Sequence, residues 1–439
     1  MSHALGVRIL FAMFEGGGNL SLILPIVARL VDRGHDVRVL AGPNVRAGRP
    51  PMSERFLPRI RATGATPVVL PTPTPHPFDD ARFGWTPPWL DRLTPNCAPL
   101  VWSRAWAEGV RAELARARAD VVAADFILLG ALAGAEAAGV PATALVHGTW
   151  KHRPAPGTPP YGTGFLPSQG LLGRLRAAPF NALFEYRYRR DGLPPLNAAR
   201  RSVGLLPLRS TFEQFDRAER VLLLSSAAFD MPPRPLPENV RYVGAPVERA
   251  PNTAWRPPWS ADDLRPLVLV GLSTLRQGQG PVMQRVIEAL GALPVRALVT
   301  LGPSLDRSDF VAPPNTVIEA FVPHDVVMPL ADVMVTQCGL GTLAKALAFG
   351  LPLVCIPLLA DQPGNAALVV ARGAGVRLSS RARPNEIARA IMRVLGEARF
   401  REAARQLSSQ ISREDGALNA AVELERLADR TSAGRAVTP

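Results

Sequence analysis

The chain has 439 residues, so we expect two or three domains of ordinary size rather than one. Apolar residues make up 47% of the chain and charged residues 20%, a balance that is typical of folded proteins and excludes a disordered or low-complexity chain. The formal net charge is +13, but lysine and arginine do not form runs interleaved with aromatic residues, so no nucleic-acid partner is expected.

The first apolar run and the cysteines indicate the compartment. The first apolar run is only about eight residues long and reaches Glu15 without a small-residue cleavage site, which predicts a buried strand rather than a signal peptide. The longest apolar runs break at Asp125, Glu136 and Asp361, too early for a membrane-spanning helix. The three cysteines are far apart, which excludes a disulfide framework and a Cys-rich zinc site. We expect a cytoplasmic protein, with association at a membrane surface as the alternative that the positive charge leaves open.

Short apolar runs alternate with amphipathic stretches from one end of the chain to the other. In the first half the predicted strands are 7–14, 36–41, 66–70, 121–124, 143–147 and 220–225. In the second half they are 266–273, 295–302, 316–321, 333–336, 352–357 and 375–378. Helices are predicted between them, for example over 22–33, 281–293, 342–349 and 384–395. Apolar strands separated by helices predict parallel sheets covered on both faces.

Two Pro-rich stretches divide this alternation. They lie at 231–237 and 251–258, and we place an interdomain linker at 228–262. Residues 1–227 then form an N-terminal domain and 263–410 a C-terminal domain, followed by a C-terminal helix and tail over 411–439. The predicted fold class is α/β, with two Rossmann-like domains facing each other across a cleft and ligands at the carboxyl ends of the strands.

A Pro- and Gly-rich insertion over 151–192 lies late in the first half. Its segment 174–190 combines five arginines with six large apolar or aromatic residues, namely Leu175, Phe180, Leu183, Phe184, Tyr186 and Tyr188. A helix of this composition can lie on an anionic membrane surface. It can also pack its apolar face against its own domain, which is the interpretation we favour.

The most informative segment is 331–367, where a predicted strand runs into Gly339, Gly341 and Thr342 at the start of a helix. Glycines let the backbone approach a ligand closely, and a helix N-terminus offers free N–H groups and a positive dipole end. This pattern predicts a phosphate site, although a tight strand–helix turn alone would also explain it. Ser273 and Thr274, after another predicted strand, are further candidate donors.

The order of motifs resembles that of the nucleotide-sugar glycosyltransferases with two Rossmann-like domains (the GT-B class), the bacterial natural-product and macrolide glycosyltransferases and their plant secondary-metabolite relatives. The resemblance covers nearly the whole chain, from 16–25 through Asp125 and 139–141 to 321–324, 336–342 and 361–362. It implies a nucleotide sugar bound against the C-terminal domain and an acceptor bound against the N-terminal domain.

The resemblance also implies roles for single residues in donor binding. Phe321 and Val322 would hold the base, and His324 would lie near the ribose. The glycine loop would hold the diphosphate, and Asp361 with Gln362 would bind sugar hydroxyls. A carboxylate beside an amide matches the donors and acceptors of a diol. Core packing and helix capping are the structural alternatives for these residues.

Two positions depart from the family pattern. Gln337 stands where the family has a histidine on the diphosphate, and Lys345 stands where it has a glutamate on the ribose hydroxyls. The first change keeps a neutral donor. The second inverts a charge, so Lys345 either reaches a phosphate or is a solvated helix residue. Lysine is rare in this chain, since only Lys151 and Lys345 occur among its 50 basic residues.

The expected reaction is inverting glycosyl transfer, which needs a base that deprotonates the acceptor. In the resembled family a histidine in the first strand–helix loop is this base, and a later aspartate orients it. Asp125 matches the aspartate, but Asn19 stands at the histidine position and cannot take a proton at neutral pH. Three alternatives remain: Asp125 is the base while Asn19 positions the acceptor, His147 is the base, or the site is silent.

Aromatic residues gather in one part of the N-terminal domain. Trp85, Trp89 and Trp150 are predicted to contact an apolar acceptor, and core packing is the alternative.

The sequence thus predicts an inverting glycosyltransferase that uses a nucleotide diphosphate sugar as donor substrate, with no cofactor and no metal, and a hydrophobic small molecule or lipid as acceptor. A catalytically impaired homologue acting as a binding or auxiliary protein, and a nucleotide-sugar epimerase, are the rival functions.

Overall fold

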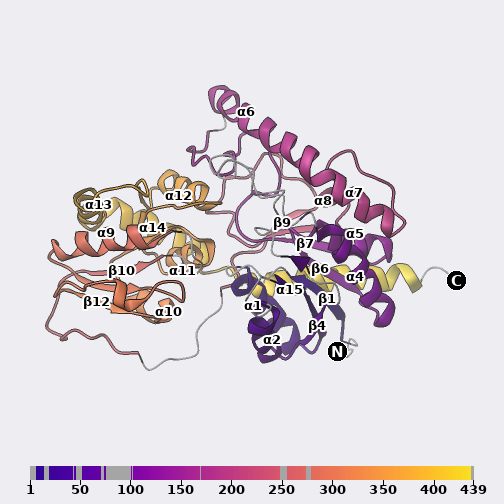
Figure 1. The fold of residues 1–439 in the computed structure, drawn as a ribbon, viewed down its shortest axis with the longest axis horizontal. Coiled ribbons are helices and arrows are strands. Elements are labelled where there is room, and N and C mark those ends of the chain that lie inside the picture. Colours follow the sequence, from indigo (N-terminus) through magenta and orange to yellow (C-terminus); the bar gives the residue numbers. More distant parts are fainter. Residues whose placement is uncertain are drawn as a thin grey trace.

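A computed structural model describes residues 6–13, 19–42, 44–45, 52–70, 74–75, 100, 102–168, 170–247, 255–272 and 278–436. Two α/β domains lie side by side, the N-terminal one in indigo to magenta and the C-terminal one in orange (Figure 1). None of the described helices is long and apolar enough to cross a membrane.

The N-terminal domain is built on seven parallel strands in the order β4-β2-β1-β6-β7-β8-β9. These strands are β1 (Arg8–Met13), β2 (Asp36–Ala41), β4 (Thr66–Val69), β6 (Val121–Asp125), β7 (Ala142–Val146), β8 (Arg220–Leu223) and β9 (Val240–Tyr242). A separate pair is formed by β3 (Asn44–Val45) and β5 (Thr74–Pro75). Every residue of β6 and β7 is buried, because helices cover both faces of the sheet.

The helices of this domain are α1 (Leu20–Asp32), α2 (Met52–Ala62), α4 (Ser103–Arg116), α5 (Leu129–Ala137), α6 (Leu171–Arg187), α7 (Leu193–Ser202) and α8 (Glu213–Asp216). A π-helical turn, Tyr188–Gly192, joins α6 to α7. Phe184 in α6 is buried and packs against Tyr188 and Phe212. Leu171, Leu172 and Leu175, at the other end of α6, are exposed. The predicted packing of this segment on its own domain therefore holds for its C-terminal half.

The C-terminal domain has six parallel strands in the order β12-β11-β10-β13-β14-β15. They are β10 (Leu267–Gly271), β11 (Arg296–Thr300), β12 (Thr316–Glu319), β13 (Val333–Thr336), β14 (Leu353–Cys355) and β15 (Gly375–Arg377). Its helices are α9 (Gly280–Gly291), α10 (His324–Val327), α11 (Leu340–Ala348), α12 (Gln362–Ala371), α13 (Pro384–Gly396) and α14 (Ala398–Ile411), with 3₁₀ turns at Arg307–Asp309 and Met328–Leu330.

The last helix, α15 (Gly416–Ala436), returns to the N-terminal domain, as the yellow ribbon in Figure 1 shows. Four of its apolar residues join the core that α1 forms with the first sheet, namely Ala420, Ala421, Leu424 and Leu427. Glu425 of α15 pairs with Arg33 and His35 just after α1. The two domains are therefore connected by the chain twice.

The predicted linker at 228–262 begins too early. Strand β9 lies inside that range and pairs with β8 in the first sheet. The Pro-rich stretch 231–237 connects two neighbouring strands of one sheet rather than two domains. A three-residue strand between proline-rich segments leaves too short an apolar run to be seen in the sequence.

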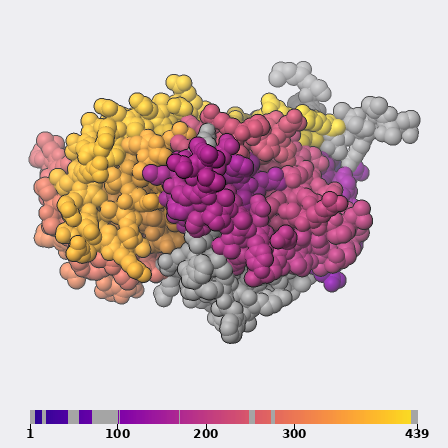
Figure 2. Space-filling model, turned by 90° about the horizontal axis from the view of Figure 1, so that it is seen from above, coloured from indigo at the N-terminus to yellow at the C-terminus, as the bar shows by residue number. Residues whose placement is uncertain are grey.

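Both sheets reverse their strand order once. The reversal lies between β1 and β6 in the first sheet and between β10 and β13 in the second. Ligands of open α/β sheets bind at such reversals, outside the carboxyl ends of the strands. In Figure 2 the magenta residues of the N-terminal domain lie directly against the orange and yellow residues of the C-terminal domain.

Candidate active site

A buried carboxylate lies at the reversal of the first sheet. Asp125 ends β6 and is fully buried. Asn19, just before α1, donates from Nδ2 to Asp125 Oδ2 at 2.9 Å, and the Ile127 N–H donates to Asp125 Oδ1 at 3.2 Å. Because β1 and β6 are neighbours, the loops that follow them bring these side chains together. The predicted pairing of Asn19 with Asp125 is present in the fold.

His147 approaches the same carboxylate from the end of β7. Its Nε2 lies 3.5 Å from Asp125 Oδ2 and has no hydrogen-bond partner among the described residues. The ring is buried and meets the ring of Phe126 edge-on. Burial, with a smaller contribution from the charge of Lys151, lowers the pKa of His147 to about 3. The imidazole is therefore neutral at pH 7.

The start of α11 lies opposite this group. Gly339 is the N-cap of the helix, and its extended backbone opens the first turn. The side-chain amide of Gln337 packs against Gly339, since a β-carbon there would lie 2.9 Å from Gln337 Nε2. A β-carbon on Gly341 would lie 3.5 Å from Ser21 Oγ of α1. The free N–H end of α11 thus meets the N-terminal domain beside the loop that holds Asn19. Thr342 follows in the first turn of α11.

The residues predicted to hold the base and ribose lie around α10. Phe321 is 74% exposed, whereas Val322 is 4% exposed and belongs to the core. His324 Nε2 forms a 2.8 Å hydrogen bond with Thr300 Oγ1. Burial, followed by the charge of Lys345, lowers the pKa of His324 to about 4. The position predicted for a ribose ligand therefore carries a histidine that is engaged inside its own domain.

Lys345, on α11, faces a carboxylate. Its Nζ lies 3.9 Å from Asp325 Oδ1, the first-turn acid of α10. A negative group is therefore present near this position, supplied by α10 and not by α11.

The predicted sugar-binding pair lies at the start of α12. The Asp361 side chain does not cap the helix, and its Oδ2 instead accepts a 2.8 Å hydrogen bond from Lys151 Nζ. Gln362 is buried, and its Oε1 accepts the N–H groups of Leu358 and Leu359 at 2.8 and 3.1 Å. The ion pair joins the two domains.

Trp150 does not lie on an open acceptor surface. It is 7% exposed and belongs to the core of the N-terminal domain, and its indole N–H donates to the Arg153 carbonyl. The number of aromatic residues in a segment does not distinguish burial from exposure, which is why the sequence did not place this side chain. Trp85, Trp89, Ser273 and Thr274 lie outside the described residues.

Sequence reasoning missed the contact between Lys151 and Asp361. These residues are 210 positions apart. The signal that could have found it is composition, because lysine occurs only at Lys151 and Lys345, and Lys151 pairs across the junction of the two domains.

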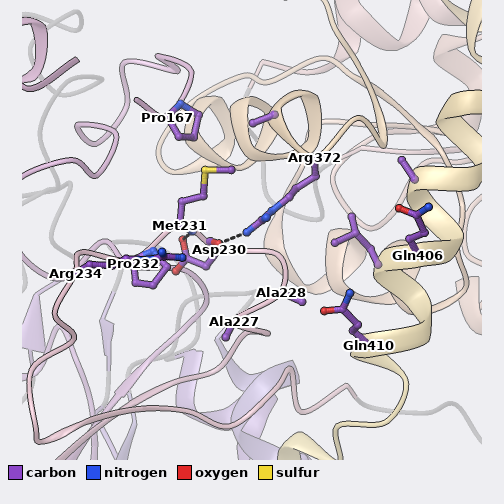
Figure 3. A pocket seen from close by; sticks show the side chains of 13 residues that line it. Pro167, Ala227, Ala228, Asp230, Met231, Pro232, Arg234, Arg372, Gln406 and Gln410 are labelled. Carbon is purple, nitrogen blue, oxygen red and sulfur yellow. Dashed lines mark hydrogen bonds between the residues drawn. The ribbon is translucent and has the colours of Figure 1, made fainter. Parts of the chain in front are cut away.

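A crevice of about 770 Å³ lies between the domains near the C-terminal end of α12 (Figure 3). Residues 227, 228, 230–232 and 234 line one side, and Arg372 with α14 residues such as Gln406 and Gln410 line the other. It contains none of the residues that the sequence singled out for donor, acceptor or catalysis.

The chain is similar to known glycosyltransferases over its whole length. The C-terminal domain family described as erythromycin biosynthesis protein CIII-like matches residues 284–426. The 4'-demethylrebeccamycin synthase of Lentzea aerocolonigenes is 30% identical over 96% of this chain and 100% of its own length. The structure of the kitacinnamycin glycotransferase aligns with a TM-score of 0.75 at 21% identity, over 97% of this chain and 100% of the other. The glycosyltransferase VinC, solved with dTDP, aligns with a TM-score of 0.68 at 19% identity over the same shares. The two parallel sheets thus form the GT-B fold, and the chain belongs to the family of bacterial natural-product glycosyltransferases that use nucleotide sugars.

Proposed function

We propose that this glycosyltransferase inverts the anomeric centre of a nucleotide diphosphate sugar as it transfers the sugar to a hydrophobic small-molecule acceptor, with Asp125 as the catalytic base. The observation that carries the proposal is the meeting of two groups at the domain junction. One is the buried pair of Asn19 and Asp125, and the other is the N-terminus of α11. The first can take a proton from an acceptor, and the second can stabilise a leaving diphosphate.

The donor half is supported by the chemistry of a helix N-terminus. The first N–H groups of α11 have no partner within the helix, and the helix dipole favours negative charge there. That charge grows as the sugar–phosphate bond breaks, so the same groups stabilise the transition state. Phe321, mostly exposed, offers a face on which a base can stack. The complex of VinC with dTDP supports a thymidine diphosphate sugar as the first donor to test.

The acceptor half depends on which group takes the proton. The acceptor oxygen attacks the anomeric carbon, its proton passes to Asp125, and the nucleotide diphosphate leaves with the electrons of the broken C–O bond. His147 is the alternative base: its Nε2 lies 3.5 Å from Asp125 Oδ2, and burial lowers its pKa to about 3, which makes it as weak a base as an ordinary carboxylate. Asn19 holds one oxygen of Asp125 and supplies an amide for positioning the acceptor.

Turnover of a donor panel tests this function. The protein is incubated with dTDP- and UDP-sugars, with and without hydrophobic phenol and alcohol acceptors, and free nucleotide and product are measured. We expect nucleotide release only with an acceptor. We also expect Gly341→Val to weaken donor binding by at least about tenfold. The fold should accept this change, because among the described residues a β-carbon at position 341 would contact only Ser21 Oγ, at 3.5 Å.

The matched control is Gly396→Val at the end of α13, where a β-carbon meets no atom of the described residues within 4 Å. It should leave donor binding unchanged. Interconversion of the donor without an acceptor would instead indicate an epimerase. Failure of every donor to bind or react would indicate an auxiliary protein, the function that Asn19, Gln337 and Lys345 favour.

A further inference from the structure

Helix α12 is held at both ends by the N-terminal domain. At its start, Lys151 Nζ donates to Asp361 Oδ2 at 2.8 Å. At its end, the guanidinium of Arg372 donates to two backbone carbonyls, that of Phe229 at 3.0 Å and that of Asp230. Figure 3 shows Arg372 reaching across the crevice to this segment. The helix that begins with the predicted sugar-binding pair is therefore hydrogen-bonded to the N-terminal domain at both ends.

Both contacts lead back to one residue of the N-terminal domain. The buried carboxylate of Asp230 accepts the backbone N–H of Trp150 and the hydroxyl of Tyr242, each at 2.6 Å. Trp150 immediately precedes Lys151. Asp230 therefore anchors the loop that carries Lys151, while its own carbonyl receives Arg372. The position of the Lys151 backbone is set independently of its side chain.

The side chain of Lys151 has a fixed path to its partner. It is 14% exposed, and its Nζ lies 5.7 Å from the centroid of the Phe126 ring. Asp361 Oδ2 also receives Asn365 Nδ2 at 3.4 Å, whereas Asp361 Oδ1 accepts no hydrogen bond from the described part of the chain. The contact with Lys151 therefore engages one oxygen of the carboxylate and leaves the other for a hydroxyl.

We propose that Lys151 is a positioning residue that fixes the Asp361 carboxylate toward the donor sugar and holds the start of α12 against the N-terminal domain. This inference rests on the proposed function, in which Asp361 binds a sugar hydroxyl. Lys151 acts through Asp361 and leaves the Asp125 carboxylate to the acceptor. Removing the ammonium removes the shorter of the two hydrogen bonds that Asp361 Oδ2 accepts, and with it the ion pair that holds the start of α12.

The test uses Lys151→Met, which keeps the aliphatic stem, and Lys151→Arg, which keeps the charge. We expect Lys151→Met to raise the donor KM about tenfold, as for a partly buried ion pair, with kcat and the acceptor KM changed less than about threefold. Lys151→Arg should restore the donor KM to within about threefold of wild type. Arg393→Met, which removes an exposed cation on α13, is the control and should change none of these values.

A second readout does not depend on turnover. Hydrogen–deuterium exchange of the ligand-free protein should be faster in the first turn of α12 in Lys151→Met than in wild type, and unchanged in Arg393→Met. If the wild type transfers no sugar, the proposed function fails while exchange still tests the contact. Four results would each overturn the inference. In Lys151→Met these are an unchanged donor KM, a change in the acceptor KM alone, or unchanged hydrogen exchange in α12. The fourth is a donor KM in Lys151→Arg that is raised as much as in Lys151→Met.

Discussion

Asn19 limits the chemistry that the buried carboxylate behind it can perform. An amide donates to Asp125 but takes no proton, so in the proposed mechanism the acceptor gives its proton to Asp125 itself. A carboxylate is a weak base, so it serves acceptors whose hydroxyl is acidic, such as phenols, better than alkyl alcohols. We therefore propose that the identity of residue 19 sets the range of acceptors.

The substitution Asn19→His should therefore widen that range. A histidine at this position can accept the acceptor's proton while Asp125 orients it, so transfer to alkyl alcohols should rise by about ten- to a hundredfold. Initial rates with matched phenol and alkyl alcohol acceptors measure the change. Asn19→Ala is the control, because it removes the amide without adding a base and should lower both rates. If Asn19→His behaves like Asn19→Ala, residue 19 has no part in proton transfer.

Single residues were predictable where the topology fixes them and not where a long side chain does. Asn19 and Asp125 follow adjacent parallel strands, so a correct strand order already brings them together. Lys151 reaches Asp361 because its side chain is long and the two domains lie against each other. Neither of these features produces a periodic pattern in the sequence. Trp150 was assigned to the acceptor because its residue type is common in binding sites, but the structure uses it for packing.

At the level of elements, strands were predicted more accurately than the segments between them. Strands β2 and β13 match their predicted bounds, and the other long strands lie within a few residues of them. Buried parallel strands are uninterrupted apolar runs, which makes their bounds visible in the sequence. Strand β9 was missed because it is short. The docking of α15 on α1 was not predicted, because an amphipathic pattern gives a buried face but not its partner.

Helix α12 shows how one element serves both domains. It belongs to the C-terminal domain by its packing, yet its two ends are hydrogen-bonded to the N-terminal domain. The two contacts are chemically different, since Lys151 and Asp361 form an ion pair whereas the Arg372 guanidinium donates to carbonyl oxygens. Removing the charge of Lys151 should therefore leave the hydrogen bonds of Arg372 intact.

The whole molecule should be sensitive to acid because three histidines are buried in the neutral form. Their pKa values lie near 3 for His147 and His152 and near 4 for His324. In the unfolded chain each returns to about 6.5, so the unfolded state binds more protons between these limits. These histidines therefore do not reduce the free energy of unfolding above about pH 6.5. As the pH falls below that value, each lowers the free energy of unfolding by up to about 1.4 kcal/mol per pH unit.

His152 is the histidine whose removal tests this expectation without changing the Asn19–Asp125 pair, His147 or the start of α11. Its ring packs between Trp150 and Phe215, with centroids 4.6 and 5.0 Å away, and its Nδ1 has no partner in the described structure. His152→Phe should stabilise the N-terminal domain by about 2 kcal/mol more at pH 5 than at pH 8. Denaturant unfolding at the two pH values measures the difference. Equal effects at both values would show that His152 does not titrate on unfolding.

Single-turnover transfer by Asp125→Asn and His147→Ala tests the central claim most directly. Both variants are first checked for an unchanged Tm and for dTDP affinity, so that loss of fold or donor binding is not mistaken for loss of the base. With Asp125 as the base, Asp125→Asn should slow transfer at least about a hundredfold and His147→Ala less than about tenfold. Full activity of Asp125→Asn together with a hundredfold loss in His147→Ala would contradict the account and assign the base to His147.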